Sequence, residues 1–148
     1  MSVGHVMSKK VRVVQPTASL ATLRTIFEES KFQHVPVIDS MHRLVGIVSV
    51  KDYYRALAPL IESAAGATLE VFLQQRKVQS VMTSPVISIS QDMHLIEAAE
   101  LLLRHNISAL PVVDALNRLI GIVSWKDIMR LIVVKQQQKK QRRHEEEE

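Results

Sequence analysis

The 148-residue sequence contains no cysteine, which excludes a disulfide framework and thiolate metal sites. It has no apolar run long enough to span a bilayer, and no charged-then-apolar leader followed by a cleavage site. Only four glycines are present and they are not clustered, so the glycine-rich loops of phosphate-loop and dinucleotide-binding proteins are missing. We therefore expect a cytoplasmic protein without membrane contact.

Patterns typical of enzymes and metal sites are equally scarce. The six histidines are scattered, with no His-x-x-x-His pair and no carboxylate at ligand spacing. No Ser-His-Asp arrangement stands out, and the serines discussed below have no evident base beside them. We expect neither catalysis, nor a metal, nor a resident cofactor.

The overall composition is that of an ordinary globular protein. Apolar residues make up 47% of the chain and charged residues 23%. The formal charge of +4 is spread along the sequence. A solvated surface with a basic tilt therefore explains it better than a dedicated anionic partner.

An internal repeat is the main positive feature of the chain. Residues 44–52, Leu-Val-Gly-Ile-Val-Ser-Val-Lys-Asp, recur 75 residues later as Leu-Ile-Gly-Ile-Val-Ser-Trp-Lys-Asp. The same offset relates Val-Met-Ser at 6–8 to Val-Met-Thr at 81–83, and it relates Val-Pro-Val-Ile-Asp at 35–39 to Leu-Pro-Val-Val-Asp at 110–114. Two copies, residues 1–59 and 78–134, are each too small to bury a good core alone. We expect them to pack together as one pseudo-symmetric domain.

Each copy predicts the same order of elements, β-α-β-β-α, in an α/β (α+β) fold. Thr17 and Asp92 stand where helix N-caps are expected, while Asp52 and Asp127 are expected to open the closing helices. Acidic turns at 39–42 and 114–117 join the last two strands of each copy. The expected strands are 11–14, 35–38 and 44–49 in the first copy and 86–89, 110–113 and 119–124 in the second, with amphipathic helices beginning near residues 20 and 95.

Two segments lie outside the copies. Residues 60–77 predict a helical linker with a break at Gly66, which either covers an exposed apolar face or binds a partner. Residues 135–148 form a charged tail that is either a frayed extension of the last helix or disordered. Its lysines and arginines suit nucleic-acid phosphates, but the four glutamates that follow nearly cancel their charge, which disfavours nucleic-acid binding.

The repeated Gly-x-x-Ser-x-x-Asp pattern carries the most chemistry. The strand ends at serine and a helix begins near aspartate, so a hydroxyl and several free helix N–H groups converge where a phosphate can bind. A carboxylate repels phosphate but suits the two hydroxyls of a vicinal diol. Gly46 and Gly121 leave room for a flat group to approach the backbone. The alternative is that serine simply caps the helix while aspartate interacts favourably with the helix dipole. Because the pattern recurs in the same register in both copies, we favour a nucleotide site.

Taken together and in this order, these motifs resemble the tandem cystathionine-β-synthase (CBS) domain pair, a regulatory module. The resemblance covers residues 3–134 and rests on Val-Met-Ser/Thr, on x-Pro-Val-hydrophobic-Asp and on Gly-Ile-Val-Ser-x-x-Asp. It implies two β-α-β-β-α repeats packed with pseudo-two-fold symmetry, further association into a homodimer, and a cleft between the repeats that binds an adenosine-containing ligand. AMP, ADP, ATP, NAD and S-adenosylmethionine are the ligands it implies.

The resemblance also implies a regulatory role. The ligand acts as a signal and not as a cofactor, and because no channel, barrel or kinase accompanies the two copies, the signal passes to a separate effector protein in trans or the protein buffers the ligand. The alternative function is a structural dimerisation module whose clefts are vestigial. The intact serine and aspartate of both copies argue against that alternative.

The resemblance assigns roles to individual residues. Asp52 and Asp127 are the implied ribose ligands. The implied phosphate contacts are Ser49, Ser124, Lys51, Lys126 and His34, although a lysine at a helix start is also an ordinary solvated residue. The implied purine pocket, largely of backbone atoms, consists of Val11, Arg12, Val35, Pro36, Val86, Ile87, Leu110 and Pro111.

The two copies differ at three relevant points. Ala109 stands in the second copy where the first has His34, and Ser-Pro at 84–85 replaces Lys-Lys at 9–10. Trp125 replaces Val50 and either packs at a dimer face or stacks on a ligand. If only one site is functional, His34 and the lysine pair favour the first for an anionic ligand.

Overall fold

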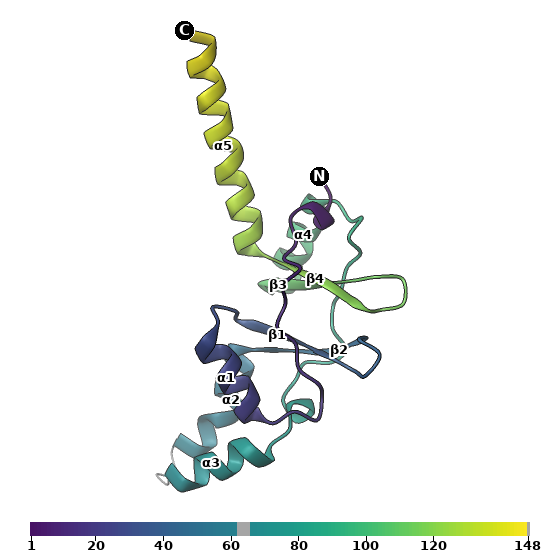
Figure 1. The fold of residues 1–148 in the computed structure, drawn as a ribbon, viewed down its shortest axis with the longest axis vertical. Helices are drawn as coiled ribbons and strands as arrows, with labels where there is room; N and C mark the ends of the chain where they lie inside the picture. Colours follow the sequence, from purple (N-terminus) through teal and green to yellow (C-terminus); the bar gives the residue numbers. More distant parts are fainter. Residues whose placement is uncertain (62–65, 148) are drawn as a thin grey trace. The chain divides into compact units, whose positions relative to one another are not determined.

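The computed structural model describes residues 1–61 and 66–147 (Figure 1). It contains two short antiparallel hairpins and five α-helices, so the predicted mixed α/β (α+β) fold is confirmed. Among the described residues no helix is both long and apolar enough to cross a membrane. In chain order the elements are η1 (Val3–His5), α1 (Leu20–Glu29), β1 (His34–Ile38), β2 (Leu44–Ser49), α2 (Val50–Ile61), α3 (Gly66–Gln75), η2 (Val78–Ser80), α4 (Leu95–His105), β3 (Ala109–Val113), β4 (Leu119–Ser124) and α5 (Trp125–Glu147).

The chain folds into two compact units whose boundaries differ from those of the sequence copies. Unit 1 contains residues 1–9, 88–114 and 120–148, and unit 2 contains residues 10–87 and 115–119. Each unit therefore combines the helices and most of the hairpin of one copy with the short leading segment of the other; we call residues 1–9 and 78–87 the exchanged segments. In unit 2, Ile47 and Thr83 exchange backbone hydrogen bonds of 3.1 and 2.8 Å; in unit 1, Ser8 and Ile122 do the same at 2.8 and 3.0 Å.

The first predicted strand of each copy is wrong in extent, because only one residue pairs. Val14 forms a single parallel bridge with Val37: its N–H donates to the Pro36 carbonyl at 3.2 Å, and its carbonyl accepts from Ile38 at 2.9 Å. The bond that would extend this parallel pairing toward the N-terminus needs an N–H at Pro36, and proline has none. The proline that lies in the middle of β1 thus ends the parallel pairing on that side.

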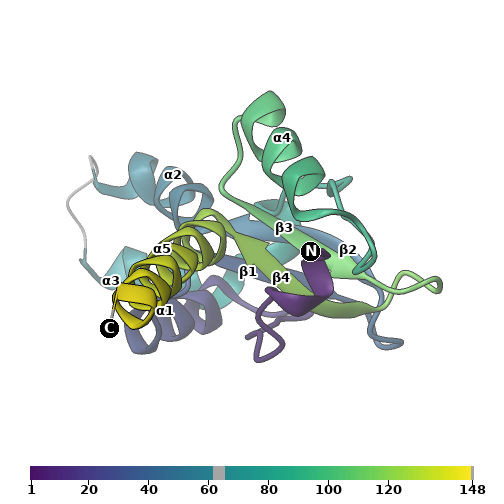
Figure 2. The same cartoon turned by 90° about the horizontal axis from the view of Figure 1, so that it is seen from above.

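The second copy repeats this interruption. Ile89 bridges Val112 and donates to the Pro111 carbonyl at 3.0 Å, while Val113 donates to the Ile89 carbonyl at 2.9 Å. Ile87, two residues earlier, again faces a proline without an N–H. Figure 2 shows β3 and β4 of this hairpin side by side.

Each unit has its own apolar core. In unit 2 the core lies between the β1–β2 hairpin, α1 and α2, and Leu73 of α3 joins it with 1% of its surface exposed. The linker helix α3 begins at Gly66, and residues 62–65 before it lie outside the described part of the chain. In unit 1 the core includes Val3 from the leading segment together with residues of α4, β3, β4 and α5. Residues 135–147 continue α5 as a helix.

The helices begin at Leu20 and Leu95 as predicted, but the N-caps expected at Thr17 and Asp92 are wrong by two residues. The residues that precede the first turns are Ser19, without a side-chain capping bond, and His94, whose ring accepts from the Ile96 N–H at 3.1 Å. The reason is tertiary: the Leu20 N–H donates to the Arg76 carbonyl at 2.9 Å, and the Leu95 N–H to the Met1 carbonyl at 3.0 Å. Backbone carbonyls of the linker and of the leading segment at Met1 therefore satisfy groups that a local cap usually serves.

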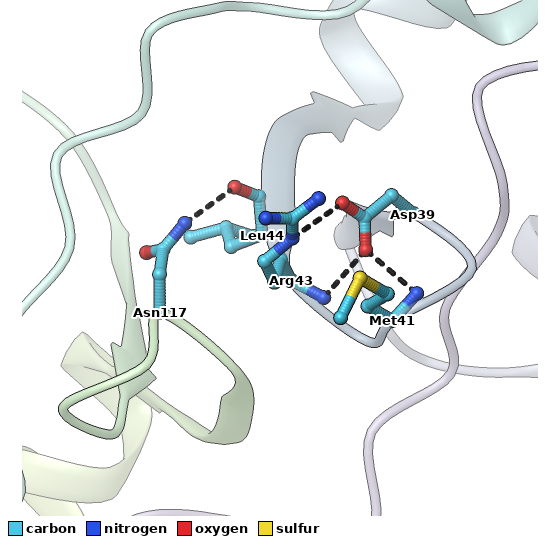
Figure 3. A network of polar contacts seen from close by, with 5 residues as sticks. All are labelled: Asp39, Met41, Arg43, Leu44 and Asn117. Carbon is cyan, nitrogen blue, oxygen red and sulfur yellow. Dashed lines mark hydrogen bonds and ion pairs between the residues drawn. The ribbon is translucent and has the colours of Figure 1, made fainter.

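The turns at 39–42 and 114–117 form as predicted, and the two are hydrogen-bonded to each other within unit 2 (Figure 3). His42 and Asn117 occupy the left-handed region, with φ of 64° and 62°. Leu44 donates to the Asn117 carbonyl at 3.0 Å, and Leu119 donates to the His42 carbonyl at 3.1 Å. Because these pairs are related by the same 75-residue offset, the contact has the pseudo-two-fold symmetry expected from the repeat.

Candidate functional site

Ser49 and Asp52 form a reciprocal capping box at the start of α2. The Asp52 N–H donates to Ser49 Oγ at 3.1 Å, and the Ser49 N–H donates to Asp52 Oδ2 at 2.9 Å. Serine at the cap position and an acidic residue three positions later is the pattern that satisfies two orphan helix donors at once. Helix α2 therefore begins at Val50, two residues before the Asp52 start expected from the sequence.

Ser124 and Asp127 repeat the box at the start of α5, which begins at Trp125. The Ser124 N–H donates to Asp127 Oδ2 at 2.8 Å, and the Asp127 N–H donates to Ser124 Oγ at 3.4 Å. One bond differs: the Ser124 hydroxyl also donates to Asp127 Oδ2 at 3.1 Å, and no corresponding Ser49 bond occurs among the described residues. Only Ser49 therefore keeps its hydroxyl hydrogen for another acceptor.

The expectation that several free N–H groups converge at each helix start is wrong. Besides the two donors of the box, the Val50 N–H donates to the Gln33 carbonyl at 2.8 Å. Of the four N–H groups at the start of α2, only that of Lys51 has no partner within the described residues. The second copy is the same, because Trp125 donates to the Ser108 carbonyl at 3.2 Å. A phosphate at either start would meet one main-chain donor, not several.

His34 lies beside this helix start in unit 2. It is the residue paired with Ser49 in the β1–β2 ladder, and the negative charge of Asp52 is near enough to act on it. Burial lowers the pKa of His34 below its ordinary value, while Asp52 opposes that change. The structure thus brings together three of the residues assigned to the first site, His34, Ser49 and Asp52. At the equivalent position of the second copy, Ala109 is buried.

Both aspartates keep one carboxylate oxygen directed away from the box. Asp52 Oδ1 lies 3.8 Å from Arg55 and Asp127 Oδ1 lies 3.5 Å from Arg130, with 20% and 14% of the two aspartate side chains exposed. A carboxylate has about four lone-pair sites, so one capping oxygen leaves acceptor capacity for a diol. The capping role and a ligand role are compatible on the same side chain.

The glycine interpretation is wrong for both copies. Met82 occupies the space in which a side chain at Gly46 would lie, with its Cγ 3.0 Å from a Cβ built there. Met7 does the same at Gly121, where Sδ is 2.6 Å and the Ser8 carbonyl oxygen 3.0 Å from the built Cβ. The close approach that these glycines allow is that of a methionine from an exchanged segment, not of a flat ligand.

The remaining implied contacts are spread more widely. Lys51 and Lys126 are exposed at their helix starts, and Trp125 is half-buried against the core of unit 1. Lys9 belongs to unit 1 and Lys10 to unit 2.

The residues of the implied purine pocket differ in burial. The four on the β1 and β3 strands are buried, and those on the leading segments are half-buried or exposed; the buried ones are Val35, Pro36, Leu110 and Pro111, and the others are Val11, Arg12, Val86 and Ile87. Of the set, Val11, Arg12, Val35, Pro36, Val86 and Ile87 belong to unit 2, and Leu110 and Pro111 belong to unit 1.

Two contributors to the helix starts were missed in the sequence. The carbonyls of Gln33 and Ser108 hold the first N–H of α2 and α5, and no side-chain pattern predicts a main-chain acceptor. Met7 and Met82 were noted as part of a repeated motif, but their contact with the glycines was not foreseen. The repetition of Val-Met and Gly in one register was the signal that could have indicated it.

The chain matches a known family twice. The family model for the CBS domain matches residues 3–59 and again residues 78–134. Among solved structures, the CBS domain pair of protein MJ0100 in complex with 5′-methylthioadenosine and S-adenosyl-L-methionine has a TM-score of 0.76 and 29% identity, covering 91% of this chain and 98% of that one. CBSX2 from Arabidopsis thaliana in complex with AMP has a TM-score of 0.74 and 31% identity, with coverage of 91% and 98%.

Longer proteins also contain a similar segment. Homoserine O-acetyltransferase of Methanococcoides burtonii is 38% identical over 131 residues, which are 88% of this chain but 24% of that protein. Inosine-5′-monophosphate dehydrogenase of Methanocaldococcus jannaschii is 31% identical over 126 residues, 85% of this chain and 22% of that protein. The chain thus spans about a quarter of the length of these relatives.

Proposed function

The chain belongs to the CBS domain family as a tandem pair, and we propose that it is a regulatory module whose clefts bind an adenosine-containing ligand. The observation that carries the proposal is the twofold recurrence of the Ser-x-x-Asp helix start in a chain similar to structures that hold AMP or S-adenosylmethionine. In the proposed complex, Asp52 and Asp127 accept hydrogen bonds from ribose hydroxyls through the carboxylate oxygen that the capping box leaves open.

The first helix start supports a phosphate contact better than the second. The Ser49 hydroxyl keeps its hydrogen, and the His34 ring lies on the neighbouring strand. At the second start, the Ser124 hydroxyl already donates to Asp127, and Ala109 replaces the histidine. The phosphate of a nucleotide therefore binds in the first site, with Lys51 supplying a main-chain N–H and an exposed ammonium group.

The proposed signal is a shift between conformations and not a chemical step. A ligand shifts such an equilibrium only by its difference in affinity for the two conformations, so the partner must recognise the form that the ligand prefers. We place this partner in trans, as a separate protein in the cytoplasm. Catalysis is not part of the proposal, because the serine and aspartate of each capping box are engaged with each other in stabilising a helix start.

Calorimetric titration with AMP, ATP, NAD and S-adenosylmethionine tests the proposal. Asp52→Asn is the informative variant, because its side-chain oxygen still accepts from the Ser49 N–H while the negative carboxylate is lost. Asp127→Asn is its matched control at the other helix start. Saturable binding of one ligand that Asp52→Asn weakens and Asp127→Asn leaves intact supports a functional first site. Wild-type affinity in both variants would contradict the ribose assignment.

A structural module remains the second candidate, and the capping boxes favour it. Stabilising two helix starts is by itself a sufficient reason for serine and aspartate at these positions. Under this function, both asparagine variants lower the thermal stability of the protein, and none of the four ligands changes the midpoint of unfolding. A ligand-dependent increase in that midpoint in the wild type rejects the structural candidate.

A further inference from the structure

The C-terminal half of α5 carries a row of cations along one side of the helix. Trp125, Ile128 and Leu131 of α5 pack against the core of unit 1, whereas all residues from 132 to 147, the yellow end of α5 in Figure 1, are exposed. In this exposed part four cations occur at the i, i+4, i+7 and i+8 positions, the spacing that places side chains on one face of a helix. We call this face the basic stripe, and its residues are Lys135, Lys139, Arg142 and Arg143.

The helical conformation changes how the glutamates at the end of the sequence affect this charge. By net charge alone, the four glutamates nearly cancel the cations that precede them. In the helix, however, Lys135 and Lys139 stand about 15 and about 9 Å before Glu145 along the axis. Both separations exceed the Debye length of about 8 Å at physiological ionic strength. The first half of the stripe therefore keeps its positive potential.

The second half of the stripe is only weakly neutralised. Glu146 follows Arg142 by one helical turn, and Glu147 follows Arg143 in the same way. In both pairs the cation precedes the acid, which is the less favourable orientation for an i, i+4 ion pair. Within the described part of the chain, none of the four cations of the stripe forms an ion pair. Their N–H donors are therefore available to an external anion.

The composition of the segment 135–147 narrows the class of partner. It consists of lysine, arginine, glutamine, histidine and glutamate, so it has no apolar side chain to bury. A protein interface has an apolar core, and a helix that lies on a membrane inserts an apolar face, so neither partner suits this segment. Single-stranded nucleic acids are bound largely by stacking on aromatic rings, and phenylalanine, tyrosine and tryptophan are absent from it. The phosphates of a duplex need only charge and hydrogen bonds, which the segment offers.

We propose that the basic stripe of α5 binds the phosphate backbone of duplex DNA without sequence preference. The stripe extends over about 12 Å of the helix, which is comparable with the major groove of B-form DNA, about 12 Å wide and able to admit an α-helix. The major groove of an RNA duplex is too narrow for one. Glutamines on the other side of the helix add uncharged hydrogen-bond donors; they are Gln137, Gln138 and Gln141. The proposal does not rest on nucleotide binding in the clefts.

Fluorescence anisotropy with a labelled DNA duplex of about 20 base pairs tests the proposal. The wild type should bind the duplex, and a duplex of scrambled sequence should bind equally well. Because four phosphates are contacted, the affinity should fall about a hundredfold between about 50 and about 200 mM KCl. Absence of binding at the lower salt concentration overturns the proposal, and so does tighter binding of a single strand of the same length.

A pair of charge variants separates the stripe from the total charge of the protein. Lys139→Gln combined with Arg143→Gln should weaken binding of the duplex at least about tenfold and reduce the slope of log affinity against log salt by about two. The matched control combines Lys31→Gln with Lys77→Gln, which removes the same charge from exposed positions outside α5 and should leave the affinity unchanged. Equal losses in both double variants would mean that total charge and not the stripe causes binding.

Gln138→Pro tests whether the helix is required, because it keeps every charge. Proline inside a helix removes a hydrogen bond and clashes with the preceding turn, so Lys135 is no longer aligned with the cations that follow. The affinity for the duplex and its salt dependence should both decrease. The midpoint of thermal unfolding should stay the same, since position 138 is exposed and lies outside the core of unit 1. Unchanged affinity would mean that an irregular basic tail is sufficient, which overturns the stripe.

Discussion

The thioether of Met82 fills the space beside Gly46 in which any side chain at position 46 would lie. Met82 belongs to the leading segment of the second copy and Gly46 to β2 of the first, so the contact fastens the exchanged segment within unit 2. Met7 and Gly121 make the same contact in unit 1. The repeated Val-Met and Gly motifs are therefore two halves of one packing interaction.

Replacing Gly46 by alanine should destabilise the protein by about 1–3 kcal/mol, because the new methyl group overpacks against Met82. Gly121→Ala should cost more, since a backbone oxygen of Ser8 also lies 3.0 Å from the built Cβ and cannot turn away. Urea unfolding measures both losses. Gly4→Ala should cost less than either, because the nearest neighbours of a Cβ built at Gly4 are 3.3 Å away, which is tight but longer than the closest contacts at the other two glycines.

The double variant Gly46→Ala with Met82→Ala tests the contact itself. Shortening Met82 makes room for the alanine methyl group, so the double variant should be less destabilised than the sum of the two single variants. Additive losses would mean that the two residues do not press on each other.

Replacing Ser49 by alanine removes a side-chain acceptor from the start of α2. The expected loss is about 1 kcal/mol of unfolding free energy, within the range measured for such caps. Ser124→Ala should cost at least as much, because the Ser124 hydroxyl also donates to Asp127. Ser49→Thr keeps the acceptor and should retain most of the stability in the same thermal or urea unfolding experiment.

Asn117 has two separable functions in the contact between the hairpin turns. Its φ of 62° favours glycine or asparagine, and its side-chain Nδ2 donates to the Leu44 carbonyl at 3.1 Å (Figure 3). Asn117→Gly keeps the conformation and loses the bond, at a cost of about 1 kcal/mol. Asn117→Ala loses the bond and strains the backbone by a further ~1–2 kcal/mol. Chemical unfolding of both variants should give that order, and equal stabilities would contradict it.

His34 should make stability depend on mildly acidic pH. Burial lowers the pKa of His34 below 6.5 in the folded protein, whereas in the unfolded chain the ring takes up a proton near 6.5. The unfolded state therefore binds more protons in this window, and the free energy of unfolding falls as the pH drops below about 6.5. His34→Gln should weaken this dependence in urea unfolding at about pH 5.5 and 7.5, whereas His144→Gln, at an exposed position, should not.

Much of the fold could be predicted from local patterns. The 75-residue repeat, the apolar runs at 44–49 and 119–124, and the turns before them correspond to hairpins in the structure. The serine and aspartate of each helix start could be paired because they are three residues apart, and a capping box is a local interaction. Interactions between residues so close in sequence can be predicted without the tertiary structure.

The errors concern partners distant in sequence. The Leu20 N–H donates to the Arg76 carbonyl and the Val50 N–H to the Gln33 carbonyl, so neither the missing side-chain cap of the first helix nor the loss of phosphate donors could be predicted from neighbouring residues. In the same way, Gly46 gave no indication that Met82 would occupy its open side.

The sequence alone determined which residues recur, and therefore the family and the pairing of serine with aspartate at each helix start. Only the tertiary structure decided which segment packs on which hairpin. A repeated sequence allows each leading segment to pack on its own copy or on the other one, and the two choices have the same local pattern. The backbone bonds of Thr83 to Ile47 and of Ser8 to Ile122 select the exchange, because buried main-chain groups must find partners wherever the chain brings them.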